Sequence, residues 1–234
     1  MVPASGIQYN STTMSDRSTK KTSPSHSVAE TYEEGLRLFA GKGDLNKTLV
    51  RLARSLNQHE IDYVVVGAVA LIAYGYKRFT EDIDLVLTRE GIERLHLELI
   101  GLGYAPSFPG AKKTIRSTPE GVSIDILISG EYPGDGKPKP VVIPRPDESS
   151  IEIDGIRVVT LEKLIELKLA SGMTAPDRLR DLADVQELIR IRKLDAQFAE
   201  RLNPYVRDKY LELSNAIYSA ARDEELESES TGDK

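Results

Sequence analysis

The chain has 234 residues, a formal net charge of −6 and no cysteine. The lack of cysteine excludes disulfide bridges and thiolate metal sites, and it fits a reducing compartment. The longest apolar run, residues 63–74, is too short for a membrane helix of roughly 20 residues, and the N-terminus lacks the apolar block of a signal peptide. We therefore expect a cytoplasmic protein with no membrane partner.

The negative charge is concentrated at the C-terminal end. Residues 223–234 contain six acidic residues and one lysine, so residues 1–222 carry a net charge of only −1. A near-neutral chain lacks the general basic field of a nucleic-acid-binding protein, although local basic clusters remain as contacts. The length favours one globular unit with tails.

Four segments are distinguished by composition and hydrophobic pattern. Residues 1–27 are rich in Ser, Thr, Lys and Pro, which predicts a disordered tail. Residues 28–160 mix helical and strand patterns and predict an α/β domain with N-terminal helices. Helical periodicity continues over residues 161–221 and predicts a C-terminal helical region, and residues 222–234 form an acidic tail.

The expected elements alternate between helix and strand before the helical region begins. In chain order they are the helices Val28–Ala40 and Leu45–Leu56 (the second capped by Asp44), the strand Tyr63–Val66, the helix Ala68–Tyr74, the strand Ile83–Leu87 entered by Asp82, the helix Glu90–Leu102, the strands Lys113–Ser117, Val122–Ile128 and Ile156–Val159, and the helices Leu161–Ala170, Pro176–Ile191 and Pro204–Ala221. A Gly/Pro-rich surface loop separates the last two strands.

Three aspartates are predicted to gather on one side of the sheet. Asp82 and Asp84 point the same way along a strand, about 7 Å apart, because strand side chains alternate between faces. Asp125 lies on the polar face of its own alternating strand. If the two strands are neighbours, three carboxylates converge, and a divalent cation is one of the few partners that makes such crowding favourable.

Oxygen ligands suit Mg²⁺ or Mn²⁺ rather than zinc. Two such ions roughly 4 Å apart form the usual apparatus for in-line displacement at phosphorus. The structural alternative is that the acids lie at strand ends, where they cap helices or pair with Arg78 and Lys113.

Gly67 lies between a predicted strand and a predicted helix. A glycine at this turn lets a phosphate approach the backbone closely, and the start of the helix favours its negative charge. The alternative is a tight turn without a ligand.

The run from Gly67 to Leu87 resembles the signature of the DNA polymerase β-type nucleotidyltransferase superfamily. Within it, the run is most similar to the minimal AbiEii-like enzymes of prokaryotic toxin–antitoxin systems. The matching residues are Gly67, Gly75, Arg78, Thr80, Asp82, Ile83 and Asp84. The chain has Gly67-Ala68 where many members have Gly-Ser or Gly-Gly, so a serine hydroxyl that can contact a phosphate is missing. The resemblance implies a nucleotidyltransferase fold, a small mixed sheet flanked by helices, within residues 28–160.

The likeness continues in the helical region, where such enzymes carry a lysine followed by an arginine and an Asp-x-x-Asp pair. Lys168, Arg178, Asp181 and Asp184 match this pattern. The resemblance implies that Lys168 neutralises phosphate charge and that Asp181 orients a basic residue or the nucleotide. An ordinary amphipathic helix with surface salt bridges is an equal alternative for Asp177 and Asp184.

The implied activity is metal-dependent transfer of a nucleoside monophosphate from an NTP to an acceptor, left open between tRNA, protein and a small molecule, in a toxin with a cognate antitoxin. The implied site contains Asp82, Asp84 and Asp125 as catalytic and metal-binding residues, with Gly67, Ala68, Arg78, Thr80, Lys168, Arg178 and Asp181 at the nucleotide. The alternative is a non-catalytic regulatory or antitoxin-type module that keeps the fold and binds the nucleotide and metal.

Overall fold

The computed structural model describes residues 43–231, with side chains up to Ser219. The predicted tail over residues 1–27 and the predicted helix Val28–Ala40 lie outside the described residues. None of the helices in residues 43–231 is both long and apolar enough to cross a membrane.

The described chain contains a seven-stranded mixed sheet with the order β3-β4-β5-β2-β1-β7-β6. Its strands are β1 (Tyr63–Val66), β2 (Asp82–Leu87), β3 (Tyr104–Pro106), β4 (Thr114–Ser117), β5 (Ser123–Ile128), β6 (Ser150–Ile153) and β7 (Ile156–Val159). Two pairs, β2 with β5 and β1 with β7, are parallel, and the other neighbours are antiparallel. The predicted mixed α/β architecture is confirmed.

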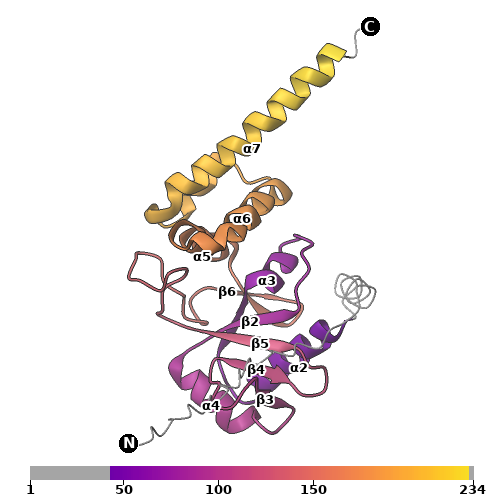
Figure 1. The fold of residues 1–234 in the computed structure, drawn as a ribbon, viewed down its shortest axis with the longest axis vertical. Helices are drawn as coiled ribbons and strands as arrows, with labels where there is room; N and C mark the ends of the chain where they lie inside the picture. The colour runs from indigo at the N-terminus through magenta and orange to yellow at the C-terminus, as the bar shows by residue number, and fades with distance from the viewer. Residues whose placement is uncertain (1–42, 232–234) are drawn as a thin grey trace, which may run out of the picture.

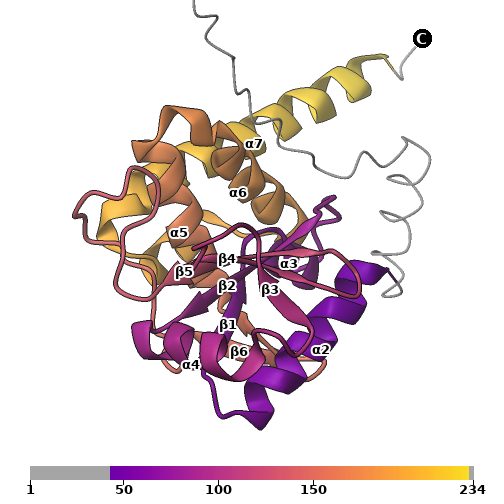
Figure 2. The ribbon, with the colours of Figure 1, turned by 60° about the horizontal axis from the view of Figure 1, so that its bottom comes forward.

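Helices lie on both sides of this sheet. They are α2 (Asp44–Gln58), α3 (Gly67–Ala73), α4 (Arg89–Leu99), α5 (Leu161–Thr174), α6 (Leu179–Arg192) and α7 (Pro204–Thr231), with the 3₁₀ turns η1 (Pro176–Arg178) and η2 (Ala196–Arg201). In Figures 1 and 2, α2 and α4 lie on one side of the strands, whereas α5, α6 and α7 gather on the other and the end of α7 projects outward.

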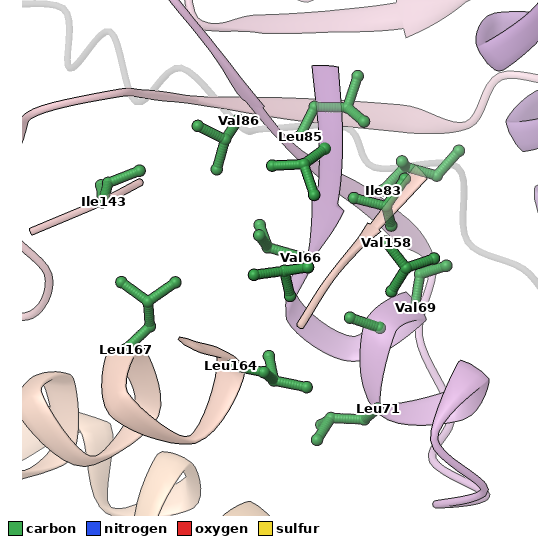
Figure 3. Packing of buried hydrophobic residues seen from close by; sticks show 14 of the residues in the cluster. Val66, Val69, Leu71, Ile83, Leu85, Val86, Ile143, Val158, Leu164 and Leu167 are labelled. Atoms are coloured by element: carbon green, nitrogen blue, oxygen red, sulfur yellow. The ribbon is translucent and has the colours of Figure 1, made fainter. Parts of the chain in front are cut away.

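A single apolar core joins the sheet to the helical region. Figure 3 shows side chains of the sheet beside side chains of α3 and α5, among them Val66, Val158, Leu71 and Leu164. All four are buried. Because burying an aliphatic side chain contributes about 1.5–3 kcal/mol, this shared core fixes α5 against the edge of the site described below.

Several predicted boundaries are wrong. Gly43, not Asp44, is the cap of α2, and Asp44 lies in the first turn of the helix, where its carboxylate accepts a 2.8 Å hydrogen bond from Lys47. Helix α4 ends at Leu99 rather than Leu102, because Gly101 and Gly103 adopt φ values of +89° and +97° that a helix does not contain.

The helical region also differs in detail. Helix α5 continues to Thr174, and the predicted helix Pro176–Ile191 is divided into η1 and α6. Helix α7 continues to Thr231, far beyond the predicted end at Ala221, because the glutamates of the acidic tail are themselves good helix formers.

Two strands were not predicted. Strand β3 has only three residues, too few for an alternation to be recognised. Strand β6 forms a hairpin with β7 through Asp154 and Gly155, which adopt φ values of +51° and +77°. An Asp-Gly pair with both residues at positive φ is the usual two-residue hairpin turn, so the sequence did contain a signal for β6.

Candidate active site

The sheet brings the three predicted aspartates onto two neighbouring strands. Strands β2 and β5 are parallel, and their register places Asp84 directly opposite Asp125 and Asp82 opposite Ser123. Ile83, between Asp82 and Asp84, and Ile124, which precedes Asp125, are fully buried. Because strand side chains alternate, the aspartates point to the other face, and the predicted juxtaposition of the two strands is confirmed.

Gly67 lies against the carboxylate of Asp84. Its φ is +64°, and a Cβ atom added there would lie 1.9 Å from Asp84 Oδ2. The backbone of the next residue, Ala68, lowers the pKa of the same carboxylate. Glycine is therefore required here both by the backbone conformation and by the approach of Asp84.

Asp84 lies in an electrostatically unfavourable position. Burial, followed by the negative charges of Asp82 and Asp125, raises the pKa of its carboxyl group to about 6, against the opposing effects of Lys168 and the Ala68 backbone. Like charges that disfavour ionisation in this way are common where a protein holds acids together for chemistry. A bound cation would relieve this repulsion.

Asp82 is held by a neutral donor. The hydroxyl of Thr80 donates a 2.5 Å hydrogen bond to Asp82 Oδ1, which fixes the direction of that carboxylate. Arg78 and Lys113 were the cations that could have paired with these aspartates. They form ion pairs with other acids instead, Arg78 with Asp184 and Lys113 with Glu131. Salt bridges to these cations therefore do not account for Asp82 and Asp84.

A second charged cluster lies between α5, α6 and the segment before β2. Lys168 donates hydrogen bonds of 2.9 Å to Asp181 and 2.7 Å to Asp184, and Arg78 donates another of 2.7 Å to Asp184. Only 7% of Lys168 and 1% of Asp184 are exposed. The surface position that the sequence left as an equal alternative for Asp184 is wrong, because Asp184 is the buried centre of this cluster.

Asp184 was recognisable from its neighbours in the sequence. It directly precedes Val185 and lies four residues before Leu188, and both are fully buried. An acid inside the apolar stripe of a helix is expected to be buried with a partner.

The first turn of α6 departs from the prediction. Arg178 is exposed and makes no ion pair with the described residues, so the structure does not bring it into the cluster. Leu179, the first residue of α6, is 67% exposed. The helix instead turns Leu182 toward α5, where its side chain lies against Gly172 and leaves no room for a Cβ atom.

The carboxylate oxygens of the three aspartates are suitable ligands for a hard cation. Their side chains do not, however, form a complete coordination sphere. Within residues 43–231, no group of three or more His, Asp or Glu side chains is positioned to hold a metal ion. Asp82 Oδ1 instead accepts the hydrogen bond of the Thr80 hydroxyl.

Comparison with known proteins gives a family match. A family model described as the nucleotidyl transferase AbiEii toxin of a type IV toxin–antitoxin system matches residues 49–233. No curated protein sequence matches the chain.

Several solved structures are similar. JHP933 from Helicobacter pylori is 18% identical with a TM-score of 0.41, over 80% of this chain and 94% of that one. The antibiotic-resistance factor ANT(2'')-Ia is 16% identical with a TM-score of 0.45, over 77% and 96%. A putative nucleotidyltransferase from Thermotoga maritima is 18% identical with a TM-score of 0.39, over 64% and 91%.

Proposed function

The chain belongs to the AbiEii family of nucleotidyltransferase toxins, and we propose that it moves a nucleoside monophosphate from an NTP to an acceptor hydroxyl with the help of Mg²⁺ or Mn²⁺. The observation that carries this proposal is the register of β2 and β5, which sets Asp125 opposite Asp84 on the face that also carries Asp82.

Asp82, Asp84 and Asp125 would hold the metal. All three offer carboxylate oxygens, the ligands that Mg²⁺ and Mn²⁺ prefer, and burial together with the charges of Asp82 and Asp125 raises the pKa of Asp84. When bound, the cation supplies positive charge to the reacting phosphate and lowers the pKa of the attacking hydroxyl.

Asp125 is the proposed general base. It accepts the proton of the acceptor hydroxyl as that oxygen forms a bond to the α-phosphorus, and the bond from the α-phosphorus to the bridging oxygen breaks as pyrophosphate leaves. Thr80 keeps Asp82 in place during this step through its 2.5 Å hydrogen bond.

The turn at Gly67 and Ala68 would receive the phosphates of the nucleotide. Lys168 acts on Asp84 electrostatically and is held by Asp181 and Asp184, a position from which its ammonium group can offset phosphate charge. Arg78 stabilises the same cluster by its bond to Asp184.

Family membership supplies the toxin–antitoxin context, so a cognate antitoxin is the proposed protein partner and the cytoplasm the proposed compartment. The proposed acceptor of the nucleoside monophosphate is the 3′ end of a tRNA, a protein hydroxyl or a small molecule. The near-neutral charge of residues 1–222 favours an acceptor that is held at one end over a long nucleic acid bound along its backbone.

The test is label transfer. The full chain is incubated with each α-labelled NTP, with Mg²⁺ or Mn²⁺, and with bulk tRNA, protein or small-molecule acceptors, and the product is identified by its mass shift. We expect transfer for at least one combination and a loss of about 10³-fold or more in Asp84→Asn and Asp125→Asn.

Asp177→Asn is the matched control, because Asp177 is an exposed acid outside the site. Full transfer by Asp125→Asn would refute the general-base assignment. Nucleotide binding without transfer to any acceptor would favour the non-catalytic module instead.

A further inference from the structure

The face of the sheet that carries the three aspartates continues onto β4. Strand β4 pairs with β5, and the register places Thr114 opposite Asp125. Two residues further along β4, Arg116 lies opposite Ser123. Ile115, between Thr114 and Arg116, is fully buried on the other face. Because strand side chains alternate, Thr114 and Arg116 share the face of Asp125.

This part of the face is open. Arg116 is exposed, and its neighbours Thr114 on β4 and Ala105 on β3 are half-buried. Helix α2 packs on the opposite side of these strands, where Arg51 donates a 2.7 Å hydrogen bond to Ser117. A ligand can therefore reach β4 from the side that carries the aspartates.

Arg116 has no partner of its own in the part of the chain that the structure describes. Its guanidinium makes no ion pair and no hydrogen bond with any residue between 43 and 219. Other basic residues around the sheet are paired, Lys113 with Glu131 and Arg157 with Asp62. A free guanidinium is available to an anionic ligand, and it binds phosphate well because its planar fork donates two parallel hydrogen bonds.

The order of the strands assigns the β4 side to the acceptor. The order is β4-β5-β2-β1, and Gly67, the proposed phosphate turn, directly follows β1. The nucleotide phosphates then lie on the β1 side of the aspartates. Because the attacking and leaving oxygens are in line at the α-phosphorus, the acceptor approaches from the opposite side. Asp125, the proposed general base, and then β4 lie on that side.

We propose that Arg116 binds a phosphate group of the acceptor, and that the acceptor is a phosphorylated sugar such as the 3′-terminal nucleotide of a nucleic acid. The inference rests on the proposed function, since it takes Asp125 as the base for the reacting hydroxyl. Arg116 is the diagonal neighbour of Asp125 across the β4–β5 pair, at about 7–8 Å. The last phosphate of a strand is likewise one sugar ring away from the terminal hydroxyl, so one acceptor end contacts both residues.

The charge of the chain agrees with recognition of a single phosphate. Residues 1–222 carry a net charge of only −1, so the chain lacks the many cations that bind a nucleic acid along its backbone. One arginine is enough to hold one terminal phosphate. A metal ion on the aspartates would offset the negative charge that otherwise repels this phosphate.

The first test measures label transfer by the full chain to matched pairs of acceptors. A dinucleotide with a free 3′ hydroxyl is compared with the nucleoside that lacks its phosphate, and ribose 5-phosphate is compared with ribose. We expect the phosphorylated member of at least one pair to be preferred about tenfold or more in kcat/KM. We expect Arg116→Gln to raise the KM of that acceptor about tenfold or more and to leave the KM of the NTP unchanged, and Arg116→Lys to restore part of the loss.

The preferred pair identifies the source of the phosphate, a nucleic-acid end for the dinucleotide and a small molecule for ribose 5-phosphate. Arg54→Gln is the matched control, because Arg54 is an exposed arginine of α2 that makes no ion pair with residues 43–219. Equal use of phosphorylated and unphosphorylated acceptors, or an unchanged acceptor KM in Arg116→Gln, would overturn the inference while label transfer still supports the proposed function. Transfer to protein hydroxyls alone would also overturn it.

A binding measurement tests the inference even where no transfer is seen. The anisotropy of a fluorescent oligonucleotide with a free 3′ hydroxyl is recorded with the full chain, Mg²⁺ and a non-hydrolysable NTP analogue at several salt concentrations. We expect Arg116→Gln to weaken binding about tenfold and to reduce the salt slope by about one, since one phosphate contact is lost. Identical binding by Arg116→Gln and Arg54→Gln would restrict the inference to the small phosphorylated sugar if transfer to ribose 5-phosphate depends on Arg116, and would overturn it if no acceptor does.

Discussion

Two carboxylates that both interact with Lys168 have very different surroundings. Asp184 on α6 is 1% exposed and accepts hydrogen bonds from two cations, Arg78 and Lys168. Asp84 on β2 is half-buried, and burial together with the charges of Asp82 and Asp125 raises its pKa, with Lys168 opposing them.

The contrast separates an acid whose countercharges are in place from acids that we propose bind a metal ion. A buried charge with its countercharges in place stabilises the packing of α5 and α6, and its removal leaves those countercharges unpaired. Acids gathered mainly among like charges reduce stability, and proteins keep such groups mainly where chemistry requires them.

Asp184→Asn is expected to cause the largest loss of stability. The substitution removes the charge that pairs with Arg78 and Lys168, and Lys168 is itself only 7% exposed. Breaking a buried ion pair by removing one partner costs about 3–5 kcal/mol, so we expect the free energy of unfolding to fall by about 3 kcal/mol in urea denaturation.

Asp177→Asn is the control for this measurement. It is an acid of the neighbouring turn η1, is exposed, and should change stability by less than about 0.5 kcal/mol. A similar small effect of Asp184→Asn would show that the cluster around Lys168 contributes little and that the contrast between the two acids is false.

Asp84→Asn is expected to act in the opposite direction. The pKa of Asp84 is raised from 3.8 to about 6, so its ionisation costs the folded state free energy that is absent below about pH 4 and fully present above about pH 6. In the presence of a chelator, the variant should be more stable than the parent chain by about 2 kcal/mol at pH 8 and nearly equal to it at pH 4.

Thermal and urea unfolding at both pH values measure this effect. A variant that is less stable at pH 8 would mean that the favourable effects of Lys168 and of the Ala68 backbone outweigh burial and the repulsion from Asp82 and Asp125. The contrast between Asp84 and Asp184 would then be wrong.

Much of the sheet site was readable from the sequence because the relevant signals are local. The strict alternation of β5 and the Asp-Ile-Asp run of β2 define which side chains share a face, and the turn at Gly67 follows from a strand that meets a helix. The cluster around Asp184 was not readable in the same way. Arg78 lies 106 residues before Asp184 in the chain, and only the packing of α6 on α5 brings them together.

Glu120→Gln tests a second paired acid on the opposite side of the sheet. Arg51, Ser117 and Thr48 all donate to the Glu120 carboxylate, and Arg51 foremost lowers its pKa from 4.5 to about 2. Since Arg51 is about one-third exposed, we expect a loss of only about 1.5 kcal/mol at pH 7.

The pH dependence of this loss follows from the sign of the shift. A lowered carboxyl pKa stabilises the folded state above about pH 4.5, and the stabilisation disappears as the pH falls through about 2. The difference between Glu120→Gln and the parent chain in urea denaturation should therefore shrink by about half or more between pH 7 and pH 3. A difference that is constant over this range would show that the ion pair with Arg51 does not form in solution.

The smallest effect is expected at Thr80, whose hydroxyl gives Asp82 the only side-chain hydrogen bond that this carboxylate makes within the described residues. Thr80→Val keeps the shape of the side chain and removes the donor, so Asp82 is free to turn. We expect stability to change by less than about 1 kcal/mol and the rate of label transfer to fall about fivefold, and we expect Thr80→Ser to restore it. Since Thr80→Ser returns only the hydroxyl, failure of this rescue would mean that Thr80 acts through packing, and the site would then hold Asp82 by the strand alone.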